Sequence, residues 1–298
     1  MMLDIFSKLT FLSIFTDIKE FFNKQIPVAD WVDEAVKWTT DTFSWFFDPI
    51  KEDFGDQLEK FAELLADIPP SIVIVITVII AFFLSGKKFG LPSFTLVGLL
   101  FIYNQQLWEQ LMSTFTLVLV ASLISVIVGI PVGILMSKSK WAEAIIKPIL
   151  DFMQTMPAFV YLIPAVVFFG IGMVPGVFAS FIFATPPVVR FTNLGIRQVS
   201  KELVEASDAF GTTGSQKLFK VELPMAKTTI MAGVNQTVML SLSMVVIASM
   251  IGAPGLGRDV LSALQRASAG TGFVAGLSIV ILAIIMDRIT QNINKEKS

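Results

Sequence analysis

Long apolar stretches fill the chain from Pro69 almost to its end, whereas the first 68 residues mix apolar and polar positions at helical spacing. A helix needs about 20 mostly apolar residues to cross a bilayer. The pattern therefore predicts an all-α polytopic membrane protein with about seven transmembrane helices. The predicted spans are residues 70–85, 89–103, 110–136, 147–170, 174–195, 227–251 and 271–289.

The first 68 residues predict amphipathic helices that do not cross the membrane, because no apolar run approaches 20 residues. This segment carries 6 Lys and 14 Asp or Glu residues. Aromatic-rich amphipathic helices are typical of the membrane interface, so we expect an acidic, extracytoplasmic scaffold over residues 1–68. A small soluble helical domain packed on itself is the alternative. The apolar stripes are Ile5, Leu9, Leu12, Phe15, Ile18 and Phe22; Trp31, Ala35 and Trp38; and Phe54, Leu58, Phe61 and Leu65.

The basic residues of the short loops predict the orientation, since cytoplasmic loops collect Lys and Arg. Fourteen of the 22 Lys and Arg residues lie on the same side of the predicted membrane as the polar segment 200–225, and eight lie on the other side. We therefore expect the N-terminus outside, the C-terminus inside, and segment 200–225 in the cytoplasm. The transmembrane domain would cover residues 69–290, followed by a cytoplasmic tail at 291–298.

Composition excludes several classes of protein. Hydrophobic residues make up 54% of the chain and charged residues 15%, and there is no Cys or His. Thiol chemistry, His-metal sites and imidazole catalysis are therefore absent. No chain of carboxylates crosses the predicted membrane, as a proton-driven carrier would need, and no paired acids or activated nucleophile suggest an intramembrane enzyme. We expect no catalytic residue, no metal, no cofactor on this chain and no nucleic-acid partner.

Glycine and proline residues interrupt three of the predicted spans. Gly129–Gly133, with Pro131 between them, should break the third span, Pro157 and Pro164 the fourth, and Pro186–Pro187 the fifth. Broken backbone is tolerated at membrane depth where protein or a water-filled cavity covers it. The interruptions therefore favour a transport pathway over a simple anchor, although proline is also common in ordinary membrane helices.

The polar segment between the fifth and sixth spans has the composition of a small helical hairpin. It contains Glu205-Ala-Ser-Asp-Ala-Phe-Gly211 and, ten residues later, Val221-Glu-Leu-Pro224. Gly211 and Gly214 are expected to supply the turn, because glycine adopts positive φ without steric cost. Pro224 is expected to end the second short helix.

This segment resembles the coupling motif of permease subunits in binding-protein-dependent ABC importers. The family pattern is Glu-Ala-Ala, three residues, Gly, nine residues, an aliphatic residue, any residue, then Leu-Pro. The single departure is Ser207 in place of the second Ala, a change between small residues; a generic surface hairpin is the alternative. The matching positions are Glu205, Ala206, Ser207, Gly211, Val221, Leu223 and Pro224.

The resemblance implies a type I ABC importer fold and a hairpin that inserts into a groove on a cytoplasmic ATPase subunit. ATP and Mg²⁺ would bind to that ATPase and not to this chain. The implied assembly has two permease copies, two ATPase subunits and an external substrate-binding protein. Because the chain ends at Ser298, we expect the binding protein to be a separate polypeptide.

Three further segments resemble one branch of the family, the glycine betaine/proline betaine permeases of the ProW and OpuAB type. They are Gln154–Pro164, Ala184–Arg190 and Ile251–Gly257, and the resemblance covers residues 70–290. It implies uptake of quaternary-ammonium osmoprotectants across a bacterial cytoplasmic membrane. Permeases for choline, carnitine or another small solute are the alternative within the family, and an ATP-independent osmotic channel is the alternative from another class.

Two groups of residues are candidates for contact with the substrate or with the binding protein. In the outer loop 254–272, charged residues could contact the binding protein, although a plain connecting loop is equally compatible. Residues after the break in the fourth span, and on one face of the sixth, could line a pathway with weak polar and π contacts; ordinary helix packing is the alternative. The pathway candidates are Met156, Pro157, Phe159, Tyr161, Asn235, Met239 and Ser243, and the loop candidates are Arg258, Asp259 and Arg266.

Overall fold

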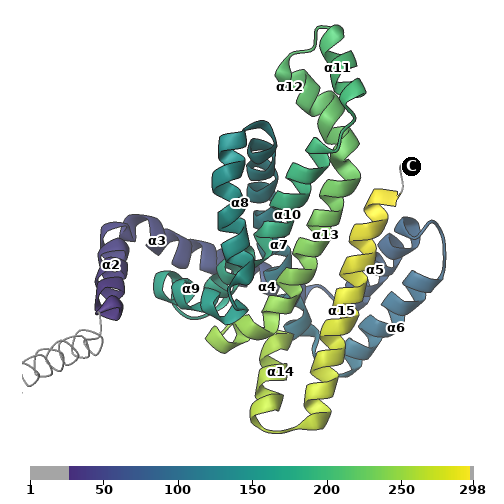
Figure 1. Ribbon diagram of the computed structural model, residues 1–298. Coiled ribbons are helices and arrows are strands. Elements are labelled where there is room, and N and C mark those ends of the chain that lie inside the picture. Colours follow the sequence, from purple (N-terminus) through teal and green to yellow (C-terminus); the bar gives the residue numbers. More distant parts are fainter. Residues whose placement is uncertain (1–26, 296–298) are drawn as a thin grey trace, which may run out of the picture. The chain divides into compact units, whose positions relative to one another are not determined.

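A computed structural model describes residues 27–295, and every element within that range is helical (Figure 1). The apolar stripe from Ile5 to Phe22 lies outside the described residues. The chain divides after Phe46 into two compact units. Outside the hairpin, the helices are α2 (Val28–Thr42), α3 (Ser44–Lys51), α4 (Asp53–Asp67), α5 (Pro70–Leu84), α6 (Gly90–Asn104), α7 (Trp108–Lys138), α8 (Lys140–Thr155), α9 (Leu162–Phe169), α10 (Met173–Arg197), α13 (Leu223–Ala248), α14 (Leu256–Gln265) and α15 (Ala269–Lys295).

Helix α2 makes up most of the described part of the first unit. The predicted stripe of Trp31, Ala35 and Trp38 lies on this helix, and 59% and 63% of the surfaces of Trp31 and Trp38 are exposed. The Trp38 ring meets Phe43 edge to face, with centroids 6.2 Å apart. No residue of α2 is buried. Exposed aromatic residues on an amphipathic helix are what a membrane interface would cover, and that location stays a prediction.

Helices α7, α10 and α13 form the centre of the second unit. A Cβ added to Gly133 of α7 would lie 2.7 Å from the carbonyl oxygen of Val189 on α10, and one added to Gly129 would lie 2.3 Å from Val188. Small residues let membrane helices approach closely in this way. The expected break at Gly129–Gly133 is therefore wrong. Helix α7 continues through Pro131, and its two glycines are contact points.

The break expected at Pro186–Pro187 is also wrong, because α10 runs without interruption through both prolines. Hydroxyl groups of neighbouring helices donate to backbone carbonyls beside them. The hydroxyl of Thr237 on α13 donates to the carbonyl of Ala184 at 2.8 Å, and that of Ser125 on α7 donates to the carbonyl of Phe181 at 3.2 Å. These bonds tie α10 to α7 and α13 just before the prolines, and such packing by neighbouring helices is where a membrane helix tolerates proline.

The break at Pro157 is confirmed. Helix α8 ends at Thr155, and the chain bends by 110° into a 3₁₀ turn, Ala158–Tyr161, which leads into α9. Pro164 lies in the first turn of α9 and breaks nothing there. All seven predicted apolar stretches are helical, but four of the described helices are long and apolar enough to cross a membrane alone, or up to six spans if each bent pair is counted.

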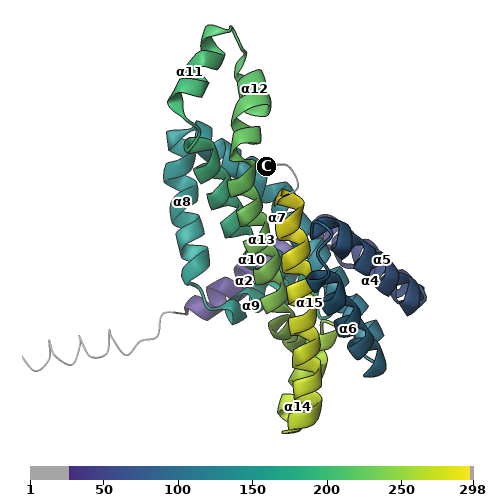
Figure 2. The same ribbon diagram turned by 90° about the vertical axis from the view of Figure 1, so that its right-hand side faces the viewer.

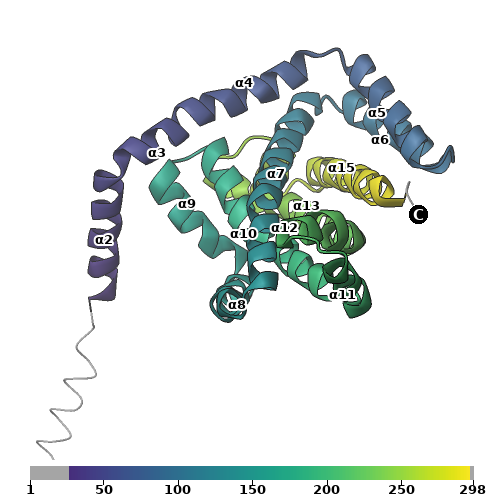
Figure 3. The same ribbon diagram turned by 90° about the horizontal axis from the view of Figure 1, so that it is seen from above.

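Helix α4 packs across the N-terminal ends of α7 and α10 (Figure 3). Leu58 and Ala62 are buried there, and a Cβ on Gly55 would contact Val174 of α10 at 3.1 Å. The helical stretch that ends at Asp67 turns by 91° into α5. Because α5 is apolar enough for a membrane, an amphipathic helix at a right angle to it suits the interface. The third predicted stripe is thus helical and packs on the core.

Candidate functional site

The polar segment forms a helical hairpin that extends beyond the bundle from α10 and α13 (Figure 2). Its first arm is α11 (Lys201–Ala209), and its second begins with α12 (Gly214–Lys217). Gly211 occupies the turn with φ +74°, and a Cβ there would meet no atom within 4 Å. Gly214 has no positive φ and is the first residue of α12, so the expectation that it shapes the turn is wrong.

Side chains within the hairpin hold its two arms together. Ser207 is buried; its hydroxyl donates to the carbonyl of Val204, and its own carbonyl accepts from the hydroxyl of Thr212 at 2.8 Å. Lys217 contacts the carboxylate of Asp208 across the turn at 2.8 Å. A capping box of Thr213 and Gln216 starts α12. The hairpin is therefore stabilised before any partner binds, and Ser207 serves the hairpin itself.

The tip presents an apolar side chain that sequence reasoning passed over. Phe210, directly before Gly211, has 89% of its surface exposed, and Phe219 on the second arm has 64% exposed. Glu205 and Ala206 are also exposed. A large aromatic residue held out on a rigid polar projection is typical of a docking anchor. Its signal in the sequence is one Phe within an otherwise polar run.

The second arm continues into the membrane helix, so the expectation that Pro224 ends it is wrong. Residues Leu218–Glu222 form a π-helical turn, in which the N–H of Leu223 donates to the carbonyl of Leu218. Proline clashes with the carbonyl four residues before it, and a wider turn at that point lets the helix pass. Such π-turns are frequent at functional sites. The second arm of the hairpin and α13 thus form one continuous helical segment.

Ion pairs connect the base of the hairpin and its neighbours to α7 and α8. Glu222, whose side chain is 7% exposed, pairs with Lys138 at the end of α7. Arg197 at the end of α10 binds Glu143 of α8 at 2.7 Å and the carbonyl of Met136 at 3.1 Å. Farther along the same helices, Arg190 of α10 contacts Asp151 of α8 at 2.6 Å. A movement of the hairpin would therefore pull directly on α7, and a movement of α10 on α8.

The first group of pathway candidates surrounds the bend between α8 and α9. Phe159 has 56% of its surface exposed, and Pro157 is exposed beside it. Tyr161 is 3% exposed, and its hydroxyl donates to the carbonyl of Met153, which anchors the bend. Met156 packs against the same small cluster. In this group, therefore, Phe159 and Pro157 are exposed, whereas Tyr161 and Met156 stabilise the bend.

The second group follows one face of α13. The amide of Asn235 donates to the carboxylate of Asp287 on α15 at 2.9 Å, and Gln291 donates to the same oxygen at 2.7 Å. Met239 packs against the large core, whereas Ser243 is exposed and donates to the Met239 carbonyl at 3.0 Å. The structure places this group against the main core and the first group against a separate cluster.

The outer-loop candidates lie on α14 or, for Arg266, directly after it, at the end of the bundle opposite the hairpin (Figure 1). The N–H of Leu256 donates to the hydroxyl of Thr114 at 2.8 Å, which fixes α14 to α7. Asp259 and Arg266 line one cavity of about 570 Å³, together with residues of α15 and the turn after α6. Arg258 is exposed outside it. Burial raises the pKa of the Asp259 carboxyl, and neighbouring Arg258 partly opposes this effect.

Residues 27–295 contain no group of three acidic, Cys or His side chains that could hold a metal ion. A family model described as "Binding-protein-dependent transport system inner membrane component" matches residues 125–298. The chain belongs to this family. The match includes the hairpin, the bent span and α14, and it identifies the protein as the permease subunit of a transport system and a multi-pass membrane protein.

Relatives of the permease extend the similarity to nearly the whole chain. It is 58% identical over 273 residues to the glycine betaine/carnitine transport permease GbuB of Listeria monocytogenes serotype 1/2a (strain 10403S), covering 91% of this chain and 96% of that one. It is 50% identical to the glycine betaine permease OpuAB of Bacillus subtilis (strain 168), covering 92% and 96%. Identity to the glycine betaine/proline betaine permease ProW of Escherichia coli (strain K12) is 47%, covering 95% and 79%.

A solved structure matches the fold of the permease. The membrane chain of the MetNI methionine ABC transporter, in an inward-facing conformation, aligns with a TM-score of 0.57 and 21% identity. The alignment covers 61% of this chain and 92% of that chain. Together with the all-helical architecture, it confirms the expected type I ABC importer fold.

Replacing Asp259 with Asn should raise the melting temperature of the permease at alkaline pH. A carboxyl with a raised pKa favours the folded state below its unfolded pKa, and this contribution is lost as pH rises through the folded pKa. The advantage of Asp259→Asn over wild type should therefore shrink on acidification. Fluorescence melting of the detergent-solubilised protein at several pH values measures it. Asp56→Asn, at an exposed position, should change little, and an equal response of both variants would contradict the assignment.

Proposed function

We propose that the chain is the permease of an ATP-driven importer that takes up glycine betaine and related quaternary-ammonium osmoprotectants. The observation that carries this proposal is the identity of 47–58%, over more than nine-tenths of the chain, to permeases whose names specify betaine transport. The hydrolysis of ATP would take place on a partner subunit that binds ATP and Mg²⁺. This chain would contribute the path through the membrane and the hairpin that couples ATP hydrolysis to uptake.

The hairpin is the proposed docking element for the ATPase. Glu205, Ala206 and Phe210 are exposed on its first arm and tip, while Gly211 gives the turn a shape that other residues adopt only with strain. Phe210 would insert into an apolar pocket of the ATPase, and Glu205 would meet a basic or N–H donor group there. Val221, Leu223 and Pro224 would act differently, by joining the hairpin to α13 through the π-turn.

The proposed assembly places the hairpin and the C-terminus in the bacterial cytoplasm and the N-terminus outside. The hairpin, the α7–α8 turn and the α5–α6 turn share one end of the second unit (Figure 1). All three segments contain or adjoin Lys residues. Two copies of the permease would enclose the pathway between them. The binding protein would deliver substrate at α14, where Asp259 and Arg266 line the outer cavity and Arg258 is exposed.

The pathway is proposed to run along the bend between α8 and α9 and the exposed face of α13. Phe159 and Pro157 would face the solute, with Ser243 on α13, whereas Met156, Tyr161, Asn235 and Met239 would shape the wall from behind. Aromatic rings attract quaternary ammonium groups. A path with few strong contacts suits transit, since a tight site would slow release.

Carnitine is a second candidate substrate, favoured by the name of the relative from Listeria monocytogenes. It shares the trimethylammonium and carboxylate groups of glycine betaine but has a longer chain. The binding protein would discriminate between the two through the size of its aromatic cage. Both candidates require the same permease architecture.

The test is uptake by the permease reconstituted in proteoliposomes with its ATPase and binding protein. Labelled glycine betaine should accumulate only when ATP, ATPase and binding protein are all present, and excess unlabelled proline betaine or carnitine should reduce uptake according to affinity. Uptake without ATP would instead indicate an osmotic channel. ATP-dependent uptake of another solute, without uptake of betaine, would contradict the proposed substrate but would still support an ATP-driven importer.

A further inference from the structure

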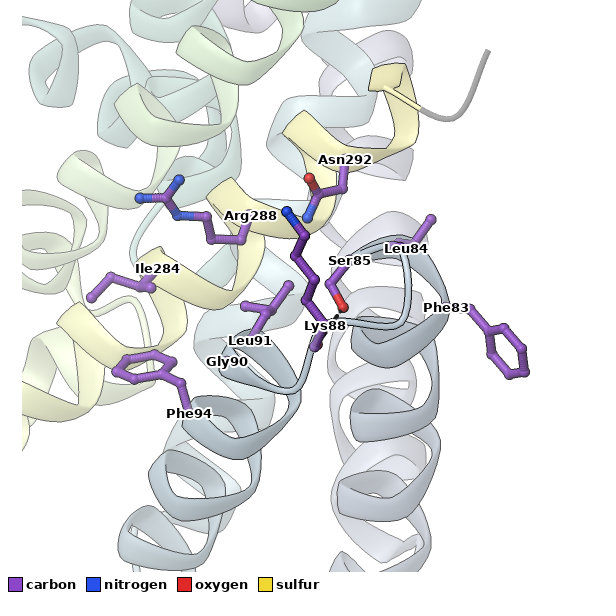
Figure 4. Close-up of a pocket in the computed structure, with 11 residues that line it drawn as sticks. Phe83, Leu84, Ser85, Lys88, Gly90, Leu91, Phe94, Ile284, Arg288 and Asn292 are labelled. Atoms are coloured by element: carbon purple, nitrogen blue, oxygen red, sulfur yellow. Dashed lines mark hydrogen bonds between the residues drawn. The ribbon is translucent and has the colours of Figure 1, made fainter. Parts of the chain in front are cut away.

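A cavity of about 650 Å³ lies between the α5–α6 turn and the last turns of α15. Its polar end is formed by Lys88, Ser85, Arg288 and Asn292, and the Lys88 side chain reaches from the turn toward Asn292 (Figure 4). The cavity is part of neither the hairpin nor the proposed pathway. The α5–α6 turn and the end of α15, which line it, lie at the same end of the second unit as the hairpin (Figure 1).

The turn that carries Lys88 is held in an unusual conformation. Gly86 and Lys87 both have φ +64°, and the Ser85 hydroxyl donates to the carbonyl of Lys88 at 2.8 Å. A non-glycine residue such as Lys87 adopts this region at some energetic cost. The fold therefore fixes the turn so that Lys88 points along the cavity.

The polar end carries positive charge that the described part of the chain neutralises only in part. No acidic residue lines the cavity. Among residues 27–295 no carboxylate pairs with Lys88, and the carboxylate of Asp287 lies 4.0 Å from Nε of Arg288. That carboxylate already accepts hydrogen bonds from Asn235 and Gln291. Lys88 and the amide of Asn292 are thus available to an anion, and Arg288, whose guanidinium points away from them, adds positive charge to the same end of the cavity (Figure 4).

The other end of the cavity is apolar and faces the membrane. Phe94 and Ile284 have exposed surfaces along it, and Leu91 lies between them and the polar end (Figure 4). The outer surface of α5 is apolar along its length, which marks this side of the bundle as lipid-facing. A small soluble anion would make no use of such a wall, whereas an acyl chain would cover it.

We propose that this cavity binds an anionic phospholipid, with its phosphate at Lys88 and Asn292, near the positive charge of Arg288, and an acyl chain over Phe94 and Ile284. Basic pockets between membrane helices at the cytoplasmic side suit anionic headgroups. The net negative charge matters, because the cationic group of a zwitterionic headgroup would oppose Lys88 and Arg288. The bound lipid would join the α5–α6 pair to α15.

The test is native mass spectrometry of the purified permease with phosphatidylglycerol titrated against phosphatidylcholine. Wild type should retain phosphatidylglycerol in preference. The double variant Lys88→Gln/Arg288→Gln should lose about 30-fold in affinity, since each cation near an anionic surface contributes roughly a fivefold factor. The matched control Lys140→Gln/Lys147→Gln removes the same charge from exposed positions on α8 and should lose little.

Equal retention by the cavity variant and the control would overturn the proposal, as would equal retention of the two lipids by wild type. Displacement of phosphatidylglycerol by millimolar inorganic phosphate would do so too, because it would indicate a site for a soluble anion. If the double variant does not fold, Asn292→Asp places a carboxylate at the polar end and should also lower retention. Transport is not measured, so the result is independent of the substrate proposal.

Discussion

Gly211→Leu is expected to reduce betaine uptake at least tenfold while the permease still inserts in the membrane at wild-type levels. In the isolated chain the added side chain has free space, because a Cβ at Gly211 meets no atom within 4 Å. The intrinsic cost is the left-handed backbone, about 1–2 kcal/mol. A docked ATPase would fill that space, so the bulk of leucine should act mainly on docking. Uptake and ATP hydrolysis in the same proteoliposomes measure the coupling ratio.

Two further substitutions separate backbone strain from bulk at this position. Gly211→Ala adds the strain with little volume, and Gly211→Asn keeps a residue that tolerates positive φ. The ratio of uptake to ATP hydrolysis should fall slightly in the Asn and Ala variants and most in the Leu variant. If Ala is as defective as Leu, the turn conformation matters and docking bulk does not. Normal transport by the Leu variant at normal abundance would contradict the assignment of the hairpin as the coupling element.

The sequence predicted correctly those structural features that are determined by residues close together in the chain. The spacing of apolar residues predicted the helices, and the charge and turn chemistry of residues 200–225 predicted the hairpin with Gly211 at its turn. Pro157 was correctly predicted to break a span. In each case the residues that determine the structure lie close together in the chain.

The errors arose where a distant helix determines the result. Pro131 and Pro186 do not break their helices, and both lie where α7 and α10 are packed against neighbours, closely at Gly133 and through the Thr237 hydroxyl at Ala184. A π-turn accommodates Pro224, and no residue pattern in the sequence predicts that turn. Sequence can identify a proline, but whether it breaks a helix depends on the helices packed around it.

The same limit applied to the site. The motif treats its hairpin positions alike, but Ser207 is buried within the hairpin, whereas Phe210, outside the motif, is exposed. The pair of Lys138 and Glu222 joins positions 84 residues apart, so neither residue suggested a partner. Only the fold reveals that the hairpin is tied to α7.

Lys138→Met is expected to lower both the stability of the permease and its coupling. It leaves the carboxylate of Glu222, a side chain only 7% exposed, without its counter-charge. Breaking a buried pair typically costs about 3–5 kcal/mol, and the lower end is expected because 39% of the Lys138 side chain is exposed. Melting of the purified protein and the ratio of uptake to ATP hydrolysis measure the two effects.

A charge swap distinguishes a mechanical link from a general loss of stability. Lys138→Glu with Glu222→Lys restores an ion pair between the same two helices, so coupling should recover at least in part, whereas either single reversal should be worse than Lys138→Met because it places like charges together. Lys60→Met removes an exposed pair with Asp56 and should change stability by less than about 1 kcal/mol. If Lys138→Met melts and couples like wild type, the pair does not transmit force and the hairpin must act through α13 alone. If stability falls but the ratio of uptake to ATP hydrolysis does not, the pair holds the fold together without coupling it.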